Sequence, residues 1–233
     1  MQRILIIQNI KREGPGLLAP VMAEQQYEFD MLCAGEDALP ATLAGYNGLV
    51  ILGGPPSANE QTDAMIREIA FVQQALTEKM PVLGICLGLQ VLVKAAGGAV
   101  IRHSEPEIGF HDPTGALYTV TLTDAGRRDP LFAGLPNQIP VFQLHGETVT
   151  LTDNMTLLAT GAQCRIQAVR VGNHAYGLQC HFELTPEMLD VWLREDDDLQ
   201  RSDVDNIRQD FLAQQIEYTE IGRRLIRNFL EMI

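Results

Sequence analysis

Short, continuous apolar runs determine what the first half of this chain can fold into. Residues 3–8, 48–54 and 81–85 read RILIIQ, GLVILGG and PVLGI, with no alternation of polar and apolar side chains. Such strands are typical of sheets that helices cover on both faces. Residues 61–78 and 87–98 have the apolar spacing of helices. Together with a further strand-like run, YEFDML, the pattern predicts βαβ units and a parallel sheet.

The pattern changes after about residue 100. A stretch with His103 and His111 is rich in turn residues and is followed by close-set strand-like segments, and from TPEMLDVWL onward the chain has helical spacing. The acidic run at 194–203 is expected to be a solvated loop between helices. The predicted fold class is α/β, a flavodoxin-like (Rossmann-like), mostly parallel central sheet flanked by helices, with antiparallel strands added in the second half. No repeat or linker divides residues 1–233, so we expect one domain.

The net charge and the cysteine spacing limit the binding partners and the cellular compartment that we expect for this chain. A net charge of −13 repels phosphate backbones and anionic lipids, so we expect neither nucleic-acid nor membrane binding. No apolar run reaches the roughly 18 residues of a membrane span, and the first residues do not resemble a signal peptide. The four cysteines form no CxxC or metal-finger spacing. We therefore expect a cytoplasmic protein with free thiols and with neither metal nor cofactor.

The stretch PVLGICLGLQ, residues 81–90, is the strongest chemical signal. Cys86 lies between two glycines where an apolar strand changes into a helix. A tight strand-to-helix turn of this kind is typical of a nucleophile elbow. The following helix directs its N-terminus at the sulfur and favours the reactive thiolate. A small buried thiol at a tight turn is the alternative interpretation of this stretch alone.

A nucleophilic cysteine needs a base and donors for the oxyanion. His181 stands where a strand ends before a helix, and Glu183 lies on the same side of an extended segment, where its carboxylate can fix the histidine tautomer. The segment LGGPPS follows the third strand, and the glycines Gly53 and Gly54 let backbone approach a ligand closely. A simple Gly-Pro turn is the alternative there. His145, at the end of a strand, stays ambiguous.

The elements GGPPS, GICLGLQ and GLQCHFE stand in a fixed order. Together they resemble the class I (triad) glutamine amidotransferases, and most closely the free-standing proteins similar to the glutaminase domain of GMP synthase. The resemblance implies that Cys86 attacks the side-chain amide of glutamine, with His181 as acid and base and Glu183 as the orienting carboxylate. It implies a glutamyl thioester, release of ammonia, and hydrolysis to glutamate. Gly54 and Leu87 match the family's oxyanion-hole donors.

The resemblance also implies substrate contacts. Gln90, on the first helical turn after the elbow, stands where the family holds the amino-acid end of glutamine. Leu144 and His145 belong to FQLHG, which matches the segment whose backbone lies along the substrate, although the family often has Ser where Leu144 stands. Gly53 adjoins the oxyanion loop. Phe182 replaces the family's usual Pro between His and Glu, so we expect an altered turn with the chemistry kept.

The acceptor of the nitrogen is not evident in this chain. No P-loop pattern or ATP-pyrophosphatase domain occurs in the sequence, so the resemblance implies a separate synthetase or acceptor subunit. The substrate is expected to be glutamine or another γ-glutamyl compound. One alternative is a γ-glutamyl hydrolase or peptidase, which uses the same triad with a larger leaving group. A second is a non-enzymatic or redox-sensing α/β protein with a reactive elbow cysteine, which would not require His181 and Glu183.

Overall fold

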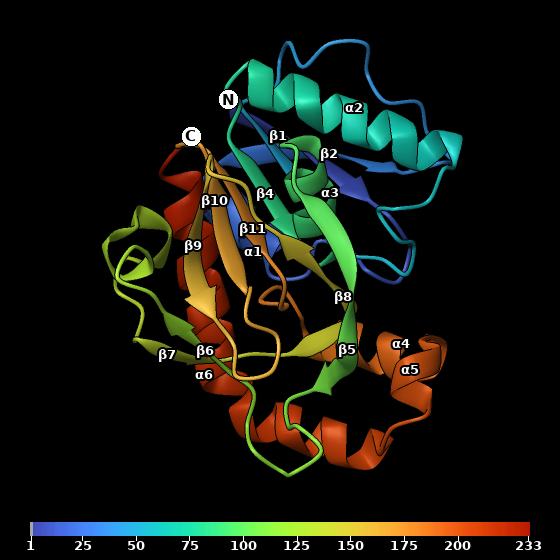
Figure 1. Ribbon diagram of the computed structural model, residues 1–233, viewed down its shortest axis with the longest axis vertical. Helices are drawn as coiled ribbons and strands as arrows, with labels where there is room; N and C mark the ends of the chain where they lie inside the picture. Colours follow the sequence, from blue (N-terminus) through green and yellow to red (C-terminus); the bar gives the residue numbers. More distant parts are fainter. Residues whose placement is uncertain (1) are drawn as a thin grey trace.

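The computed structural model describes residues 2–233 and contains a large sheet with helices on both faces (Figure 1). The nine strands of this sheet follow the order β2-β1-β3-β4-β11-β10-β9-β6-β7, and β5 pairs with β8 in a separate ribbon. The strands are β1 (Gln2–Gln8), β2 (Tyr27–Cys33), β3 (Gly48–Ile51), β4 (Val82–Ile85), β5 (Ala99–Gly109), β6 (Thr119–Leu122), β7 (Gln138–Pro140), β8 (Gln143–Thr150), β9 (Met155–Thr160), β10 (Ala168–Val171) and β11 (Ala175–Leu178). The helices are α1 (Leu18–Glu24), α2 (Asp63–Thr77), α3 (Leu87–Ala95), α4 (Pro186–Glu195), α5 (Asp197–Gln200) and α6 (Val204–Leu230), with short 3₁₀ helices at Gly126–Arg128 and Pro130–Phe132.

The first half of the chain forms the parallel part of the sheet. Strand β1 pairs in parallel with β2 and β3, β3 with β4, and β4 with β11. From β11 to β7 the pairs are antiparallel. The predicted fold class, a flavodoxin-like sheet flanked by helices with antiparallel strands added later, is thus confirmed.

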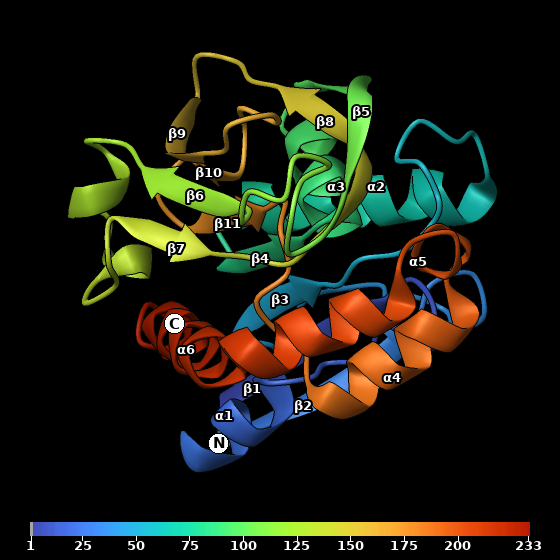
Figure 2. The same cartoon turned by 90° about the horizontal axis from the view of Figure 1, so that it is seen from below.

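Alternate residues of the continuous apolar strands pack into two hydrophobic cores, one on each face of the sheet. Ile4 and Ile6 of β1 pack on one face against α1 and the C-terminal half of α6, while Leu5 and Ile7 face α2 and α3 on the other. Figure 2 shows α1 and α6 beneath the strands. Strands buried on both faces need apolar residues at every position, which explains why these runs lack alternation.

A third apolar cluster covers the edge of the sheet where the parallel strands end. It joins the end of β5 to α4, α5 and the first half of α6, and these three helices lie together in Figure 2. Its largest members are aromatic, namely Phe110, Phe142, Trp192, Phe211 and Tyr218. Among residues 2–233, no helix has both the length and the apolar character needed to cross a membrane.

The expectation that the region around His103 is turn-rich is wrong. Residues Ala99–Gly109 form β5, which pairs with β8 in an antiparallel ribbon. Most of this strand is exposed, and its register with β8 is irregular between Arg102 and Glu107. An exposed strand whose middle is polar and which contains Pro106 shows no clear period of two, which is why the pattern did not reveal it.

The acidic run is not simply a solvated loop. It contains the short helix α5, which begins after Asp196. The Asp196 side chain accepts hydrogen bonds from the backbone N–H groups of Asp198 and Leu199, and it pairs with Arg12 at 2.7 Å. The buried Asp196 side chain therefore caps α5 and forms an ion pair, whereas its neighbours Asp197 and Asp198 face water.

Candidate active site

The loops after β1, β3, β4 and β11 meet at one edge of the sheet, because these four strands are adjacent and parallel. Open α/β sheets bind ligands at the carboxyl ends of their strands. These loops carry Glu13, Gly53, Cys86 and His181, in that order along the chain. Residues from four separate parts of the sequence therefore come together here.

Cys86 occupies a strained turn between β4 and α3. Its backbone angles are φ 54° and ψ −107°, a combination that residues with side chains rarely adopt. A Cβ on Gly84 would lie 2.3 Å from the carbonyl oxygen of Gly88, and a Cβ on Gly88 would lie 2.1 Å from the carbonyl oxygen of Ile51. The flanking glycines are thus required by close backbone contacts, as the elbow interpretation predicts.

His181 and Glu183 lie on the same side of the segment that follows β11. Nδ1 of His181 donates to Oε1 of Glu183 at 2.7 Å, and both side chains are buried. The backbone N–H of Phe182 donates to Oε2 of the same carboxylate at 2.9 Å. A proline at this position would lack that donor. Phe182 therefore adds a hydrogen bond that holds the carboxylate in place.

The charge on His181 follows from opposed effects. Burial acts to lower its pKa, but the Glu183 carboxylate and the nearby Cys86 raise it, and the pKa of His181 lies well above its usual value. A protonated imidazole beside the sulfur stabilises a thiolate. The electrostatics of the pair are therefore those that nucleophilic catalysis by cysteine requires.

Gly53 lies beside both Cys86 and His181. A Cβ on Gly53 would lie 3.1 Å from Cε1 of His181 and 3.4 Å from Cβ of Cys86. In the present conformation Sγ of Cys86 donates to the carbonyl oxygen of Leu144 at 3.5 Å, and Nε2 of His181 has no hydrogen-bond partner within residues 2–233. Nε2 of His181 is therefore available to exchange a proton with the Cys86 sulfur.

A cavity of about 410 Å³ opens above the nucleophile. Five of the residues singled out from the sequence line it together with Cys86, namely Gly54, Leu87, Gln90, Leu144 and His145. The lining does not include His181, Glu183 or Gly53. The lining carries one cationic side chain, Arg102, and four acidic ones, Glu13, Glu147, Asp196 and Asp198.

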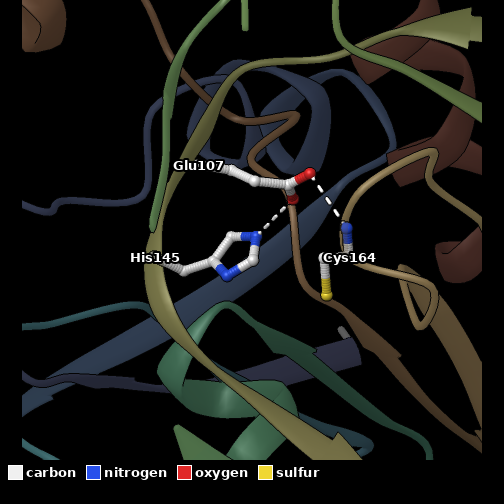
Figure 3. Close-up of side chains that lie close together, drawn as sticks. All are labelled: Glu107, His145 and Cys164. Carbon is white, nitrogen blue, oxygen red and sulfur yellow. Dashed lines mark hydrogen bonds and ion pairs between the residues drawn. The ribbon is translucent and has the colours of Figure 1, made fainter. Parts of the chain in front are cut away.

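His145 belongs to a buried network beside the cavity (Figure 3). Its Nε2 donates to Oε2 of Glu107 at 2.9 Å, and its Nδ1 lies 3.0 Å from the carbonyl oxygen of Glu147. Oε2 of Glu107 also accepts from Gln167 at 2.9 Å, and its Oε1 accepts from the backbone N–H of Cys164 at 3.1 Å. Both ring nitrogens of His145 are therefore occupied, and the residue supports the strand rather than reacting.

Glu107, His145 and Cys164 also place potential metal-ligand atoms within 4.8 Å of one another. The hydrogen bonds above already account for this grouping, since a metal would have to displace the donors from Glu107. Burial raises the pKa of the Cys164 thiol, which disfavours the thiolate that a metal would bind. The cluster is thus explained as a hydrogen-bond network that holds β5, β8 and the loop at Cys164 together.

Two residues at the site were not found from the sequence. Trp192 packs edge-on against the His181 ring, with ring centroids 4.9 Å apart at 78°. Glu13 lines the cavity with its carboxyl group buried. A usable signal existed for Glu13, because the acid in REGPG follows β1 and is flanked by glycine, as in the other loops of the site. Nothing in the sequence pattern pointed to Trp192.

Comparison with known proteins was made once this geometry was established. A family model described as "Glutamine amidotransferase class-I" matches residues 19–196. A solved structure of a glutamine amidotransferase from Thermotoga maritima superimposes with a TM-score of 0.86 and 26% identity, covering 99% of this chain and 98% of that chain.

Three curated relatives are also similar in sequence. The glutamine amidotransferase-like protein YfeJ of Salmonella typhimurium is 38% identical over 162 residues, which are 67% of this chain and 64% of YfeJ. One subunit of the glutamine-hydrolysing GMP synthase of Thermoplasma acidophilum is 27% identical, over 81% of this chain and 72% of that protein. Gamma-glutamyl peptidase 5 of Arabidopsis thaliana is 29% identical, over 71% and 64%. The match thus spans less than two thirds of YfeJ and of the peptidase.

Proposed function

Since this chain belongs to the class-I glutamine amidotransferase family, we propose that it hydrolyses the side-chain amide of glutamine with Cys86 as nucleophile. The resemblance inferred from GGPPS, GICLGLQ and GLQCHFE is confirmed at the level of the family. One observation supports the activity most directly. Cys86 stands on a strained elbow beside a cavity, next to a His181 that Glu183 holds at 2.7 Å.

The proposed reaction has two halves. The proton of the Cys86 thiol moves to Nε2 of His181, and the thiolate attacks the amide carbon. The carbonyl π electrons move onto oxygen, and the resulting oxyanion is proposed to accept hydrogen bonds from the backbone N–H groups of Gly54 and Leu87. When the carbonyl re-forms, the C–N bond breaks and nitrogen takes the proton from His181. Water then cleaves the thioester, with His181 as base, to give glutamate.

The lining of the cavity suggests how glutamine is held. Gln90 is buried on α3 within the cavity lining and can bind the amino-acid end of the substrate. Leu144 offers its backbone, because its carbonyl oxygen already contacts the Cys86 sulfur. His145, with both ring nitrogens occupied, is proposed to act by fixing that backbone. Gly53 has no side chain and is therefore proposed to let His181 and Cys86 approach each other closely.

The test is the release of glutamate from glutamine and from γ-glutamyl dipeptides by the purified chain, with Cys86→Ala as control. Glutamate release that depends on Cys86 supports the proposal. Absence of release from every γ-glutamyl substrate, while the chain is folded, would contradict it and favour a non-enzymatic role.

A γ-glutamyl hydrolase with a larger leaving group is the second candidate. A cavity of about 860 Å³ adjoins the first, and the two share Pro106 and Ile108 as lining residues. Glutamine alone does not need this room. A preference for γ-glutamyl dipeptides over glutamine in the same assay would identify this candidate, and the reverse preference would exclude it.

Ammonia from glutamine is proposed to pass to an acceptor on another protein. One relative is named as part of a glutamine-hydrolysing GMP synthase, and this sequence contains no nucleotide-binding P-loop pattern of its own. Turnover of the isolated chain would then be slow and would rise when a matching synthetase is added. Turnover that is unchanged by every synthetase of the source cell would argue for a stand-alone hydrolase.

A further inference from the structure

Glu13 is an acidic residue of the site that the proposed triad does not use. It lies in the loop between β1 and α1, is 5% exposed and lines the cavity above Cys86. Its Oε2 has no hydrogen-bond partner within residues 2–233. Buried carboxyl oxygens are rarely left without a partner, so an unpaired one on a residue that lines a cavity points to a contact made by a ligand.

The distances around Gly53 show where Glu13 lies relative to the triad. The point where a Cβ on Gly53 would stand lies 2.2 Å from Oε2 of Glu13, 3.1 Å from Cε1 of His181 and 3.4 Å from Cβ of Cys86. Cε1 is bonded to Nε2, the nitrogen that exchanges a proton with the substrate in the proposed reaction. The unpaired oxygen of Glu13 is therefore close to both His181 and Cys86, the two side chains that act on the amide in the proposed reaction.

The loop that carries Glu13 is fixed to the same elements as the triad. The backbone N–H of Leu17 donates to the carbonyl oxygen of Glu183 at 2.8 Å, and Nε1 of Trp192 donates to the carbonyl oxygen of Arg12 at 2.8 Å. The carbonyl oxygen of Glu13 itself accepts from Nε2 of Gln8 at 3.2 Å. The backbone that carries the Glu13 carboxyl group is thus fixed relative to the triad.

We propose that the Glu13 carboxylate accepts a hydrogen bond from the leaving nitrogen of the substrate amide. This inference rests on the proposed function. In the tetrahedral intermediate the nitrogen carries two N–H groups and one lone pair. An N–H held by Glu13 turns the lone pair toward Nε2–H of His181, which donates its proton as the C–N bond breaks. Glu13 neither gains nor loses a proton in this step.

The protonation of Glu13 makes the contact dependent on pH. Burial raises the pKa of Glu13 to about 7, partly opposed by His181 and increased by Glu183. The ionised carboxylate is the stronger acceptor. Among the other charged groups nearby, Arg12 lowers and Asp196 raises this pKa. Cleavage of an amide should therefore improve as the pH rises through about 7.

The experiment compares a substrate that has leaving N–H groups with one that has none. Values of kcat/KM, which report the steps through formation of the thioester, are measured for glutamine and for the γ-methyl ester of glutamate with wild type and Glu13→Gln. We expect Glu13→Gln to lower the value for glutamine by about 10- to 100-fold, as for loss of a hydrogen bond to a charged group. The value for the ester should change less than about threefold. Lys11→Gln, an exposed change in the same loop, is the control and should alter neither.

The outcomes separate this inference from the proposed function. Equal losses on amide and ester, or no loss on either, would overturn the role of Glu13 while leaving the hydrolase assignment intact. Absence of Cys86-dependent hydrolysis of both substrates by wild type would overturn both. If Glu13→Gln does not fold, the wild-type pH profiles decide the question. The amide profile should then show an ionisation near pH 7 that the ester profile lacks, and identical profiles would contradict the proposal.

Discussion

The carboxylate of Glu183 is held from two sides, by Nδ1 of His181 at 2.7 Å and by the backbone N–H of Phe182 at 2.9 Å. An ionised carboxylate only accepts hydrogen bonds, so the proton of a neutral His181 must stand on Nδ1. Nε2 is then free to take the proton of the thiol, and this nitrogen has no other partner among residues 2–233. The pair thus sets the tautomer that the proposed chemistry needs.

Replacement of Glu183 by Gln should reduce turnover without abolishing it. An amide can present its NH₂ group to Nδ1 and favour the wrong tautomer, an effect of about 10⁴-fold in a serine triad. The loss should be smaller here, because the N-terminus of α3 also favours the thiolate. Steady-state turnover and alkylation of Cys86 by a glutamine-like electrophile measure the two effects separately. If Glu183→Gln keeps wild-type turnover, the carboxylate has only a structural role. If the variant can no longer be alkylated at Cys86, the N-terminus of α3 contributes little to formation of the thiolate.

Cys86→Ser should keep the fold and lose most activity. Serine is close in size to cysteine and can adopt the same φ of 54° at a similar cost, so the elbow should persist. Its hydroxyl is far less ionised than a thiol and is a much weaker nucleophile at neutral pH. Thermal unfolding and glutamate release test the two parts. Near-wild-type release by the serine variant would show that Cys86 is not the nucleophile.

Residues close in sequence account for what could be predicted. The β1, β3 and β4 strands followed from continuous apolar runs, and the elbow at Cys86 followed from glycines two positions away. The pairing of His181 with Glu183 needed only the alternation of an extended segment. Each of these features is determined within a few residues of backbone.

Features that depend on distant partners could not be predicted. Strand β5 is defined by its pairing with β8 and not by an alternating pattern in its own sequence. Glu107 contacts His145, Gln167 and Cys164, which lie 38, 60 and 57 residues away. The position of Glu13 in the loop after β1 is visible in the sequence, but its closeness to the triad depends on β1 lying beside β3 and on the packing of its loop against Glu183. Such contacts require the topology before the residues can be connected.

Gly88→Ala should be strongly destabilising. The added Cβ would lie 2.1 Å from the carbonyl oxygen of Ile51, so β3 and α3 would have to separate. We expect a loss of about 3 kcal/mol or more in the free energy of unfolding, despite the better helix propensity of alanine. Gly115→Ala is the matched control, since its φ is +84° but no atom lies within 4 Å of the new Cβ. Its cost should be about 1–2 kcal/mol. Equal losses in urea unfolding of the two variants would contradict the argument.

Glu107→Gln should weaken the support of the substrate segment. Three donors converge on the two oxygens of Glu107, so one of them would face the new NH₂ group. We expect a loss of about 1–3 kcal/mol in stability, and a higher KM for glutamine because the backbone at Leu144 is less well held. Urea unfolding and steady-state kinetics measure both. Glu105→Gln, an exposed change in the same strand, is the control. An unchanged KM would separate the network from substrate binding.

Glu68 provides a test of the stability of the fold against pH. It is 1% exposed on α2, and its Oε1 accepts from Nδ2 of Asn9 at 3.2 Å while Oε2 has no partner within residues 2–233. Burial raises its pKa from 4.5 to about 7. Between these two pH values the folded chain keeps a proton that the unfolded chain has released. Stability from this group is therefore complete below about pH 4.5 and is lost as the pH rises to about 7.

Glu68→Gln should remove this dependence, because the neutral amide keeps an oxygen for Asn9 and has no proton to lose. The variant should match wild type near pH 4.5 and exceed its free energy of unfolding by about 3 kcal/mol at pH 8. Denaturant unfolding at both pH values measures the difference, and subtraction of the wild-type curve cancels the other titrating groups, Glu13 included. Glu78→Gln, an exposed change at the end of the same helix, should show no such trend. A constant difference between Glu68→Gln and wild type across this range would mean that Glu68 is ionised in the folded protein, and that the fold holds a buried charge beside Asn9.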